Sequence, residues 1–404
     1  MAFIFVTVVL DVLALGIIIP VLPRLIEGFL GGDTGRAAEM LGLFGTVWAL
    51  MQFLCSPALG ALSDRFGRRP VILLSNFGLG LDYVLMALAP NLGWLFVGRV
   101  ISGITGASFT TAMAYIADVT PPDRRAAGFG IVGAAWGLGF VLGPALGGFL
   151  GDMDPRLPFW VASALTLLNA TYGLFVLPES LPRADRSPFL WSRANPVGAL
   201  SLLRSRPGLF RLAGVNFLYL LAHQSLPSVF VLYTGLRYGW DGRTTGLTLG
   251  AVGLFSVLVQ AGLVRAVVAR FGERRTLIAG LVAGALAFFV YGSATSSAVF
   301  WSAIPLGALM GLFGPALQGL ITRQVGPGEQ GRLQGANTSL MGITGLIGPG
   351  LFTLTFAAFI DPARGLDMPG APFWLAALLL VFAAMLAVRA APSAAEAARA
   401  DAPA

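Results

Sequence analysis

The chain has 404 residues, of which 56% are hydrophobic and 11% charged, and it carries a formal net charge of +7 at pH 7. Soluble globular proteins carry about 25% charged residues, so this composition excludes a water-soluble domain and predicts a protein that sits in lipid. One cysteine, Cys55, and one histidine, His223, exclude a disulfide framework and a metal centre built from thiolates or imidazoles. All 26 basic residues are arginine, which excludes lysine-dependent ATP binding and Schiff-base chemistry.

Twelve apolar runs, each close to the roughly 20 residues that a membrane-spanning helix needs, follow one another along the chain. In order they cover residues 3–22, 41–62, 71–90, 94–118, 126–149, 157–177, 210–234, 245–268, 275–294, 299–323, 332–357 and 371–390. The first run has neither a charged leader nor a small-residue cleavage site, so we expect a mature helix and not a signal peptide.

The loops between these runs alternate between arginine-rich and mixed charge. The arginine-rich loops hold Arg65, Arg68 and Arg69, then Arg124 and Arg125, then Arg183, Arg186, Arg193, Arg204 and Arg206, then Arg270, Arg274 and Arg275, then Arg332. The positive-inside rule places these loops, and therefore both termini, in the cytoplasm. Because the arginines are spread over short loops, the positive charge reports topology and predicts no nucleic-acid partner.

The longest polar stretch, 178–207, is rich in Pro, Ser and Arg and lies near the middle of the chain. It predicts a linker between two bundles. We therefore expect an N-terminal six-helix bundle over 1–177, a cytoplasmic linker over 178–209, a C-terminal six-helix bundle over 210–390 and a cytoplasmic tail over 391–404.

An internal repeat relates the two predicted bundles. The same offset separates Phe66-Gly67 from Phe271-Gly272, Gly143-Pro144 from Gly348-Pro349, and Pro122 from Pro327. Pro-Phe-Trp also opens both the sixth run, at Pro158, and the twelfth, at Pro372. Two six-helix halves in the same order, related by an axis along the membrane normal, indicate an all-α membrane protein with a transporter architecture.

Three charged side chains, Asp11, Asp82 and Arg99, fall well inside predicted spans. A charge there costs roughly 2.5–3.5 kcal/mol on insertion scales, so we expect the three to face a wet cavity or one another. Two acids beside a permanent cation can bind and release protons as their surroundings change. The alternative is a static Asp–Arg pair that only supports the fold.

Two loop and helix motifs predict moving parts. Asp64 lies in an arginine-rich loop, where we expect it to accept hydrogen bonds from a facing helix or to pair with Arg68. Such a contact would hold a cytoplasmic gate shut in one state of the protein. Asp118, at the end of the fourth run, is expected to contribute to this gate. A second motif in the fifth run allows a close helix approach and a bend at its proline. Its residues are Gly139, Gly143, Pro144, Gly147 and Gly148.

Polar side chains elsewhere in the spans are candidates for lining a substrate cavity. They are Gln52, His223, Gln224, Gln260, Gln318 and Asn337. His223 is either a proton relay or a substrate contact, or else a polar residue satisfied locally.

These motifs together resemble a known family. The run Gly60-Ala-Leu-Ser-Asp-Arg-Phe-Gly-Arg-Arg69 resembles the signature between helices 2 and 3 of the major facilitator superfamily. The fifth-run glycines resemble the antiporter motif of its drug–proton exchangers, and Gly98-Arg99 resembles the helix-4 motif linked to proton coupling. Leu10-Asp11-Val12, Leu81-Asp82-Tyr83 and Pro315-Ala-Leu-Gln-Gly319 extend the resemblance to tetracycline efflux proteins.

The resemblance implies a proton-coupled antiporter that exports hydrophobic or amphiphilic, tetracycline-like drugs by alternating access. It implies a monomer in the bacterial inner membrane, with membrane lipid and a small-molecule drug as partners. It implies no enzyme activity and no cofactor, with the proton as the coupling ion and a divalent-metal chelate as a candidate form of the drug. Asp11, Asp82 and Arg99 would couple protons. The cytoplasmic gate would comprise Gly60, Asp64, Arg65, Gly67, Arg68, Arg69 and Asp118.

The sequence departs from the best-known tetracycline exporters in its second half. Ser256 and Gly284 stand where those proteins carry a histidine in helix 8 and an aspartate in helix 9. Proton coupling is therefore expected to rest on the first half alone. A metabolite uniporter or proton symporter of the same fold is the alternative function, and a non-transporting membrane receptor is a more remote one.

Overall fold

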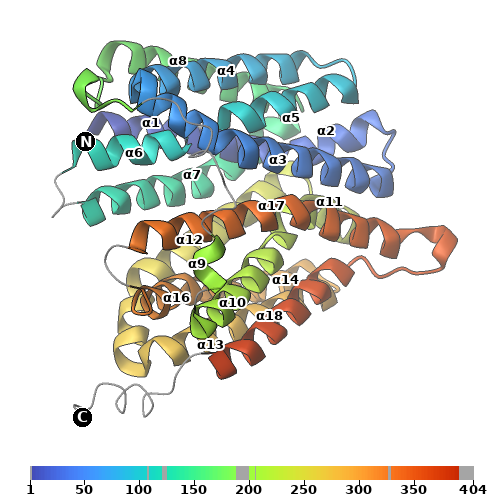
Figure 1. Cartoon of the computed structure of the whole chain (residues 1–404). Coiled ribbons are helices and arrows are strands. Elements are labelled where there is room, and N and C mark those ends of the chain that lie inside the picture. Colours follow the sequence, from blue (N-terminus) through green and yellow to red (C-terminus); the bar gives the residue numbers. More distant parts are fainter. Residues whose placement is uncertain are drawn as a thin grey trace, which may run out of the picture. The chain divides into compact units, whose positions relative to one another are not determined.

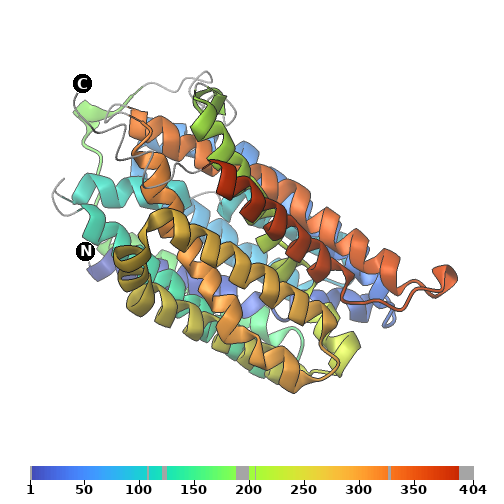
Figure 2. The ribbon, with the colours of Figure 1, turned by 90° about the horizontal axis from the view of Figure 1, so that it is seen from below.

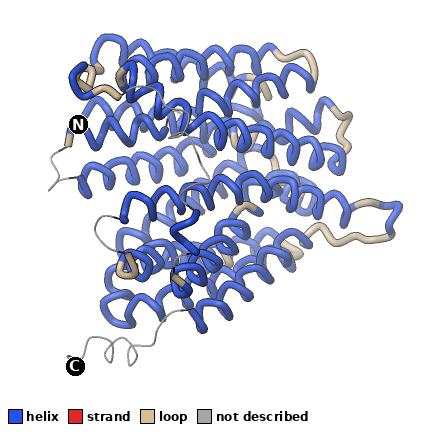
Figure 3. Tube along the Cα trace, viewed as in Figure 1, coloured by secondary structure: helices blue, strands red, loops and turns tan. Residues whose placement is uncertain are grey.

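A computed structural model describes residues 2–106, 109–120, 125–187, 200–204, 206–325 and 329–390. All regular secondary structure in these ranges is helical (Figure 3). Within the described residues, eleven helical stretches are long and apolar enough to cross a membrane, and the longest, Gly242–Ser293, is interrupted at Gly272, where φ is 76° and ψ is 164°. That stretch therefore supplies two spans, and the predicted twelve are confirmed. The repeat landmarks Pro122 and Pro327 and the tail 391–404 lie outside the described residues.

The contacts divide the chain into two compact units. Unit 1 comprises Met1–Pro196 with Phe230–Gly253, and unit 2 comprises Val197–Val229 with Leu254–Ala404. The segment Phe230–Gly253 lies in the second bundle by sequence, but its contacts are with unit 1. The predicted bundle limits of 1–177 and 210–390 stay a prediction.

Unit 1 is built on eight helices and on parts of two more. They are α1 (Ala2–Ile18), α2 (Leu22–Phe29), α3 (Thr34–Phe66), α4 (Arg68–Leu88), α5 (Leu92–Gly106), α6 (Phe109–Val119), α7 (Arg125–Met153) and α8 (Leu157–Val176), with most of α11 (Ser225–Tyr238) and the first part of α12 (Gly242–Leu258). Helix α1 packs against α7 and α8, and α4 packs against α8 and α5 (Figure 1). Pro20 follows α1 and lacks the amide hydrogen that would continue it, so α2 begins as a new helix.

Unit 2 is built around the long helix α13. Its helices are α9 (Ser201–Arg204), α10 (Pro207–His223), α13 (Val264–Ser293), α14 (Ser297–Ser302), α15 (Ile304–Ala308), α16 (Phe313–Thr322), α17 (Gln330–Ile360) and α18 (Ala371–Ala390). Helix α13 packs against α18 and α16, and α10 packs against α18 and α17. Helices α17 and α18 run side by side in Figure 2.

Several predicted spans are not continuous α-helices. The seventh is divided at Gln224, between α10 and α11. The eighth contains a π-helical segment, Val259–Leu263, and the tenth contains a 3-10 segment, Leu309–Leu312. These two irregular segments contact each other within unit 2. Irregular backbone inside a membrane span needs neighbouring protein to satisfy its polar groups, and this contact supplies such a neighbour.

Large apolar side chains cover the outside of the helices. Leu74 is 75% exposed and Phe175 is 81% exposed, on α4 and α8. Lipid is the solvent that accommodates such residues, so this surface agrees with a multi-pass membrane protein.

Candidate functional site

The turn between α3 and α4 requires a glycine. Gly67 ends α3 and begins α4 with φ of 105° and ψ of 160°, a conformation that is essentially restricted to glycine. A Cβ atom here would also collide with the carboxylate of Glu179. The Phe-Gly pair therefore marks a tight turn that only glycine can make. This turn places the next residue, Arg68, beside the last turn of α3.

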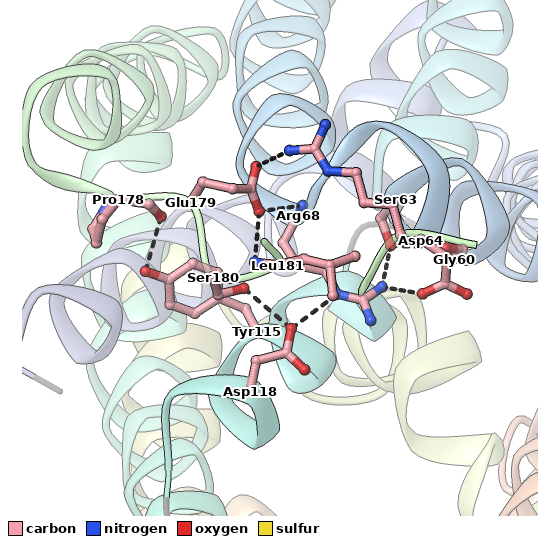
Figure 4. Close-up of polar contacts among 11 residues, drawn as sticks. Gly60, Ser63, Asp64, Arg68, Tyr115, Asp118, Pro178, Glu179, Ser180 and Leu181 are labelled. Carbon is pink, nitrogen blue, oxygen red and sulfur yellow. Dashed lines mark hydrogen bonds and ion pairs between the residues drawn. The ribbon is translucent and has the colours of Figure 1, made fainter. Parts of the chain in front are cut away.

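Arg68 is the centre of a polar network at this turn (Figure 4). Its Nη1 donates to Asp64 Oδ1 at 2.5 Å and to Ser63 Oγ at 2.7 Å. Its Nε donates to Asp118 Oδ2 at 3.1 Å, which joins α4 to the end of α6. Of the two partners expected for Asp64, the structure therefore shows Arg68.

The first residues of the linker complete the network, although their sequence did not predict such a role. Glu179 Oε1 accepts hydrogen bonds from the backbone amides of Arg68 at 2.8 Å and Leu181 at 3.1 Å. Ser180 Oγ donates to Asp118 at 3.1 Å (Figure 4). The available signal was an acid, Glu179, in a loop otherwise dominated by arginine. We call Ser63, Asp64, Arg68, Asp118, Glu179 and Ser180 the Arg68 network.

The other predicted gate residues lie around the same turn. Arg69 Nη2 donates to the carbonyl oxygen of Leu174 at 2.5 Å, which ties α4 to the end of α8. The Arg65 guanidinium lies 5.1 Å from the centre of the Phe66 ring, and Gly60 accepts a hydrogen bond from Ser63 Oγ through its carbonyl oxygen. All seven residues are thus local to one end of unit 1, and their role as a gate stays a prediction.

Three glycines on α7 bring this helix against α1. A Cβ atom on Gly139 would meet Val12, one on Gly143 would meet Gly16, and one on Gly147 would meet the carbonyl oxygen of Ile17. They repeat every fourth residue and so lie on one helix face. The close approach that the glycines predicted is present, with α1 as the partner.

A second face of α7 approaches α12. A Cβ atom on Gly148 would collide with the Gly242 carbonyl oxygen, and one on Gly246 would collide with the carbonyl oxygen of Pro144. The motif of α7 therefore serves two contacts, one to the first repeat and one to a helix that belongs by sequence to the second repeat. Its part in gating stays a prediction.

Asp152, near the C-terminal end of α7, caps the N-terminus of α12. Its Oδ1 accepts from the amide of Gly242 and its Oδ2 from the amide of Arg243, each at 2.7 Å. The Arg24 guanidinium lies 3.5 Å from Asp152 and donates to the Trp240 carbonyl oxygen at 2.6 Å. We call this arrangement the Asp152 cap. It satisfies amides that a helix start leaves unpaired, and it places an anion at the positive end of the helix dipole.

The neighbouring acid Asp241 completes the start of α12. Its Oδ1 accepts from the Thr244 amide at 2.8 Å. Hydrogen bonds from Thr244 hold the pKa of Asp241 below its usual value. Neither Asp152 nor Asp241 was predicted from the sequence to belong to a functional site.

Asp82 and Arg99 lie in the middle of unit 1. The Asp82 side chain is 2% exposed and accepts a hydrogen bond from Ser102 on α5. Gly98 makes room for this contact, since a Cβ atom there would lie 3.1 Å from Asp82 Oδ1. The Arg99 guanidinium lies 5.3 Å from the centre of the Trp48 ring, a cation–π contact with α3.

The two charges do not form a direct pair. Among the described residues no ion pair within 4 Å joins them, and neither Asp82 Oδ1 nor Arg99 Nε has a hydrogen-bond partner. Arg99 nevertheless acts electrostatically on Asp82. The static Asp–Arg pair is therefore not the arrangement seen, and one buried carboxylate oxygen is left available for a proton.

Asp11 belongs to an adjoining cluster. It is half-buried on α1 and accepts a hydrogen bond at 2.8 Å from Asn169 on α8. Tyr83, which is 3% exposed, lies in electrostatic range of Asp11, Asp82 and Arg99. The structure thus gathers the three charged residues in one region, with Tyr83 within reach of each of them.

The predicted substrate-binding residues are spread over both units. Gln52 in unit 1 lies beside Gly106, because a Cβ atom on that glycine would be 3.2 Å from the amide nitrogen of Gln52. In unit 2, Asn337 Oδ1 accepts from Asn216 at 3.4 Å. Gln318 is half-buried on α16.

The polar residues around the α10–α11 break have aromatic and glycine neighbours. His223 is exposed at the end of α10, with its ring centre 6.2 Å from that of Tyr219, and Tyr219 stacks on Phe313 at 3.8 Å. Gln224 packs on Gly348 of α17. Gln260, in the π-helical segment, faces Gly311 of the 3-10 segment.

These six residues are not linked to one another. In the ranges that the structure describes, no hydrogen bond joins the side chains of Gln52, His223, Gln224, Gln260, Gln318 and Asn337. Their role in binding substrate stays a prediction. The same ranges hold no group of three or more His, Cys, Asp or Glu side chains arranged for a metal ion.

The chain is similar in sequence and in fold to known membrane proteins of one family. The model of the Major Facilitator Superfamily matches residues 4–349 and again 262–404. The class C tetracycline resistance protein of Escherichia coli is 39% identical over 92% of this chain and 93% of its own length, and the class E protein of the same species is 38% identical over 89% and 88%. The crystal structure of the human organic anion transporter MFSD10 superposes with a TM-score of 0.71 at 25% identity, over 96% of this chain and 98% of that one. The family model and the relatives that match most of the chain show that it belongs to the major facilitator superfamily.

Proposed function

We propose that this protein is a proton-coupled antiporter that exports hydrophobic or amphiphilic drugs of the tetracycline type. Its similarity to tetracycline resistance proteins over nearly its whole length supports a drug of this class. The observation that carries proton coupling is Asp82, a buried carboxylate with one oxygen lacking a hydrogen-bond partner and with Arg99 in electrostatic range.

The proposed cycle exchanges a proton for the drug at alternate faces of the membrane. With the site open to the outside, a proton binds the Asp82 carboxylate, and the neutral form of the site releases the drug. With the site open to the cytoplasm, the proton leaves to water and the restored carboxylate favours drug binding. Arg99 stabilises the ionised form and so promotes proton release at this stage.

The proposed orientation follows the arginine-rich loops. The Arg68 network lies in the cytoplasm together with both termini, and the Asp152 cap lies on the outer side of a bacterial inner membrane. We propose that the protein works as a monomer without a cofactor. The drug enters either free or as a chelate with a divalent metal, and the metal is then part of the substrate.

The direct test uses inside-out membrane vesicles energised to an acidic interior, with tetracycline and Mg²⁺ as the probe. The wild-type protein takes up tetracycline, the addition of tetracycline releases interior protons, and an uncoupler abolishes the uptake. Repeating the assay with a chelator in place of Mg²⁺ separates the free drug from the metal chelate. Wild-type vesicles that show no uncoupler-sensitive uptake would overturn the proposed function. Protons that move in the same direction as the drug would identify a symporter.

Asp82→Asn removes the proposed proton site with little change in shape. We expect proton-driven accumulation of tetracycline to fall at least tenfold, because the amide cannot take up and release a proton. The control is Glu39→Gln, which removes an exposed carboxylate from α3 and leaves accumulation unchanged. An Asp82→Asn protein that still accumulates the drug in an uncoupler-sensitive manner would exclude Asp82 as the coupling site.

A further inference from the structure

Asn169 is a fully buried amide in the middle of α8. Its side chain is 0% exposed, and its Nδ2 donates two hydrogen bonds to α1, to the Thr7 carbonyl oxygen at 3.0 Å and to Asp11 Oδ1 at 2.8 Å. Thr7 and Asp11 are one helical turn apart, so a single amide group spans a turn of α1. Neither the sequence motifs nor the proposed cycle uses this residue.

The orientation of the amide is fixed by its neighbours. A backbone carbonyl can only accept a hydrogen bond, so the nitrogen of Asn169 must face Thr7. Asn169 Oδ1 is buried and has no hydrogen-bond partner in the described part of the chain, so no donor favours the reversed orientation. The second hydrogen of Nδ2 therefore points at Asp11, and a donor of this kind favours an ionised carboxylate over a protonated one.

We propose that Asn169 is a positioning residue for proton coupling, which holds the Asp11 carboxylate against α8 and favours its ionised form during transport. This inference rests on the proposed antiport function. It assigns to Asp11 a proton site separate from Asp82 and gives α8 a direct part in tuning it.

The surroundings of Asp11 make Asn169 its principal polar partner. From α4, the buried side chain of Asn76 is a second polar neighbour of Asp11, and Tyr83 is the titratable group in electrostatic range. Residues 126–151 of α7 contain no Asp, Glu, Arg, Lys or His, so this stretch places no charged side chain near Asp11. From α8, residues 157–176 contribute no charged side chain either. Removing the Asn169 donor therefore leaves Asp11 with Asn76 as its polar neighbour, and neither of these stretches of α7 and α8 supplies a charge to compensate.

The test is the pH dependence of tetracycline uptake by inside-out vesicles carrying Asn169→Leu, which has a similar volume and no polar group. A hydrogen bond to a charged group is strong enough to move a titration midpoint by about one pH unit. We expect the midpoint to move by that amount toward higher pH, because a proton held more firmly by Asp11 leaves only into a more alkaline cytoplasm.

The matched control is Ser163→Ala on the same helix. Ser163 is also buried and donates to a neighbouring helix, at 2.9 Å from the Gly80 carbonyl oxygen. The Ser163→Ala variant therefore loses one buried hydrogen bond but leaves the contacts of Asp11 unchanged. We expect its titration midpoint to stay at the wild-type value. Combining Asn169→Leu with Asp11→Asn should give no shift beyond that of Asp11→Asn alone, since the carboxylate on which Asn169 acts is gone.

The outcomes separate the two proposals. If wild-type vesicles accumulate tetracycline and Asn169→Leu keeps the wild-type midpoint, the positioning role is wrong while antiport stands. If Ser163→Ala shifts the midpoint as much as Asn169→Leu, the effect is one of packing and the inference also fails. Should the leucine variant not reach the membrane, Asn169→Ser, which is smaller and polar, takes its place with the same expected direction of shift.

Discussion

Gly67 and Gly272 occupy equivalent positions of the two repeats, and their backbones nearly coincide in conformation. Gly67 has φ of 105° and ψ of 160°, and Gly272 has φ of 76° and ψ of 164°. Their surroundings differ, because a Cβ atom on Gly67 would strike Glu179 whereas one on Gly272 would meet nothing within 4 Å. Substitutions at these two glycines therefore distinguish the effect of backbone strain from the effect of displacing Glu179, which belongs to the Arg68 network.

Alanine at each position measures the two effects. Gly272→Ala should lower stability through backbone strain alone, at about 1–3 kcal/mol. Gly67→Ala adds displacement of Glu179 from the Arg68 amide, so its unfolding temperature in detergent should fall further and its tetracycline uptake should fall with it. Thermal unfolding and vesicle uptake of both variants provide the measurement. Equal loss of stability and uptake in the two would show that Glu179 contributes nothing at this turn.

At the scale of elements, α7 carries two closely packed faces. The lack of a side chain at Gly139, Gly143 and Gly147 lets α1 pack closely, and the lack of one at Gly148 lets α12 do the same. Without a hydrophobic driving force between helices in lipid, such small residues permit the dispersion contacts that hold helices together. Helix α7 therefore contacts helices of both repeats, and its part in gating stays a prediction.

Gly147→Ala tests the importance of this packing. Its Cβ atom would run into the backbone of α1 at Ile17, which has no flexible side chain to move aside. We expect a loss of about 1–3 kcal/mol in stability, as for other overpacked sites, and impaired uptake. Gly314→Ala on α16 is the control, because its Cβ atom meets nothing within 4 Å and alanine is the better helix former. An unfolding temperature for Gly147→Ala as high as that of Gly314→Ala would contradict the tight α1–α7 contact.

At the scale of the whole molecule, the Asp152 cap links the two repeats at the end of α7 opposite the Arg68 network. Asp152 belongs to the first repeat, and the amides of Gly242 and Arg243 belong to the second. Alternating access requires contacts of this kind to form and break in each cycle. The Arg68 network, by contrast, joins residues of the first repeat to the start of the linker.

Asp152→Ala removes both acceptors from the start of α12 and leaves Arg24 without its carboxylate. We expect amide hydrogen exchange at residues 242–245 to accelerate about tenfold, in line with the loss of a helix cap, and tetracycline uptake to fall. Asp361→Ala is the control, since the contacts of Asp361 with the Ala363 amide and with Arg364 stay within a short local turn. Unchanged exchange at residues 242–245 in Asp152→Ala would show that the cap does not hold this end of α12.

Much of the fold could be predicted from the sequence, because lipid imposes a minimum length on every span. The twelve spans are confirmed, and the close approach at the α7 glycines follows from residue type alone. The interruptions inside spans, at Gln224 and in the Val259–Leu263 segment, were not foreseen, because hydropathy reports burial in lipid and not helix continuity.

The lipid solvent, the number of spans, the repeat and the three charges inside predicted spans could all be inferred from composition and spacing along the chain. The partners of these residues could not, because they depend on which helices pack together. Asn169 reaches Asp11, Glu179 reaches the Arg68 amide and Asp152 reaches α12, across separations of 158, 111 and 90 residues. A hydrogen bond acts over about 3 Å in space, so its partner is set by how the helices pack and not by their order in the chain.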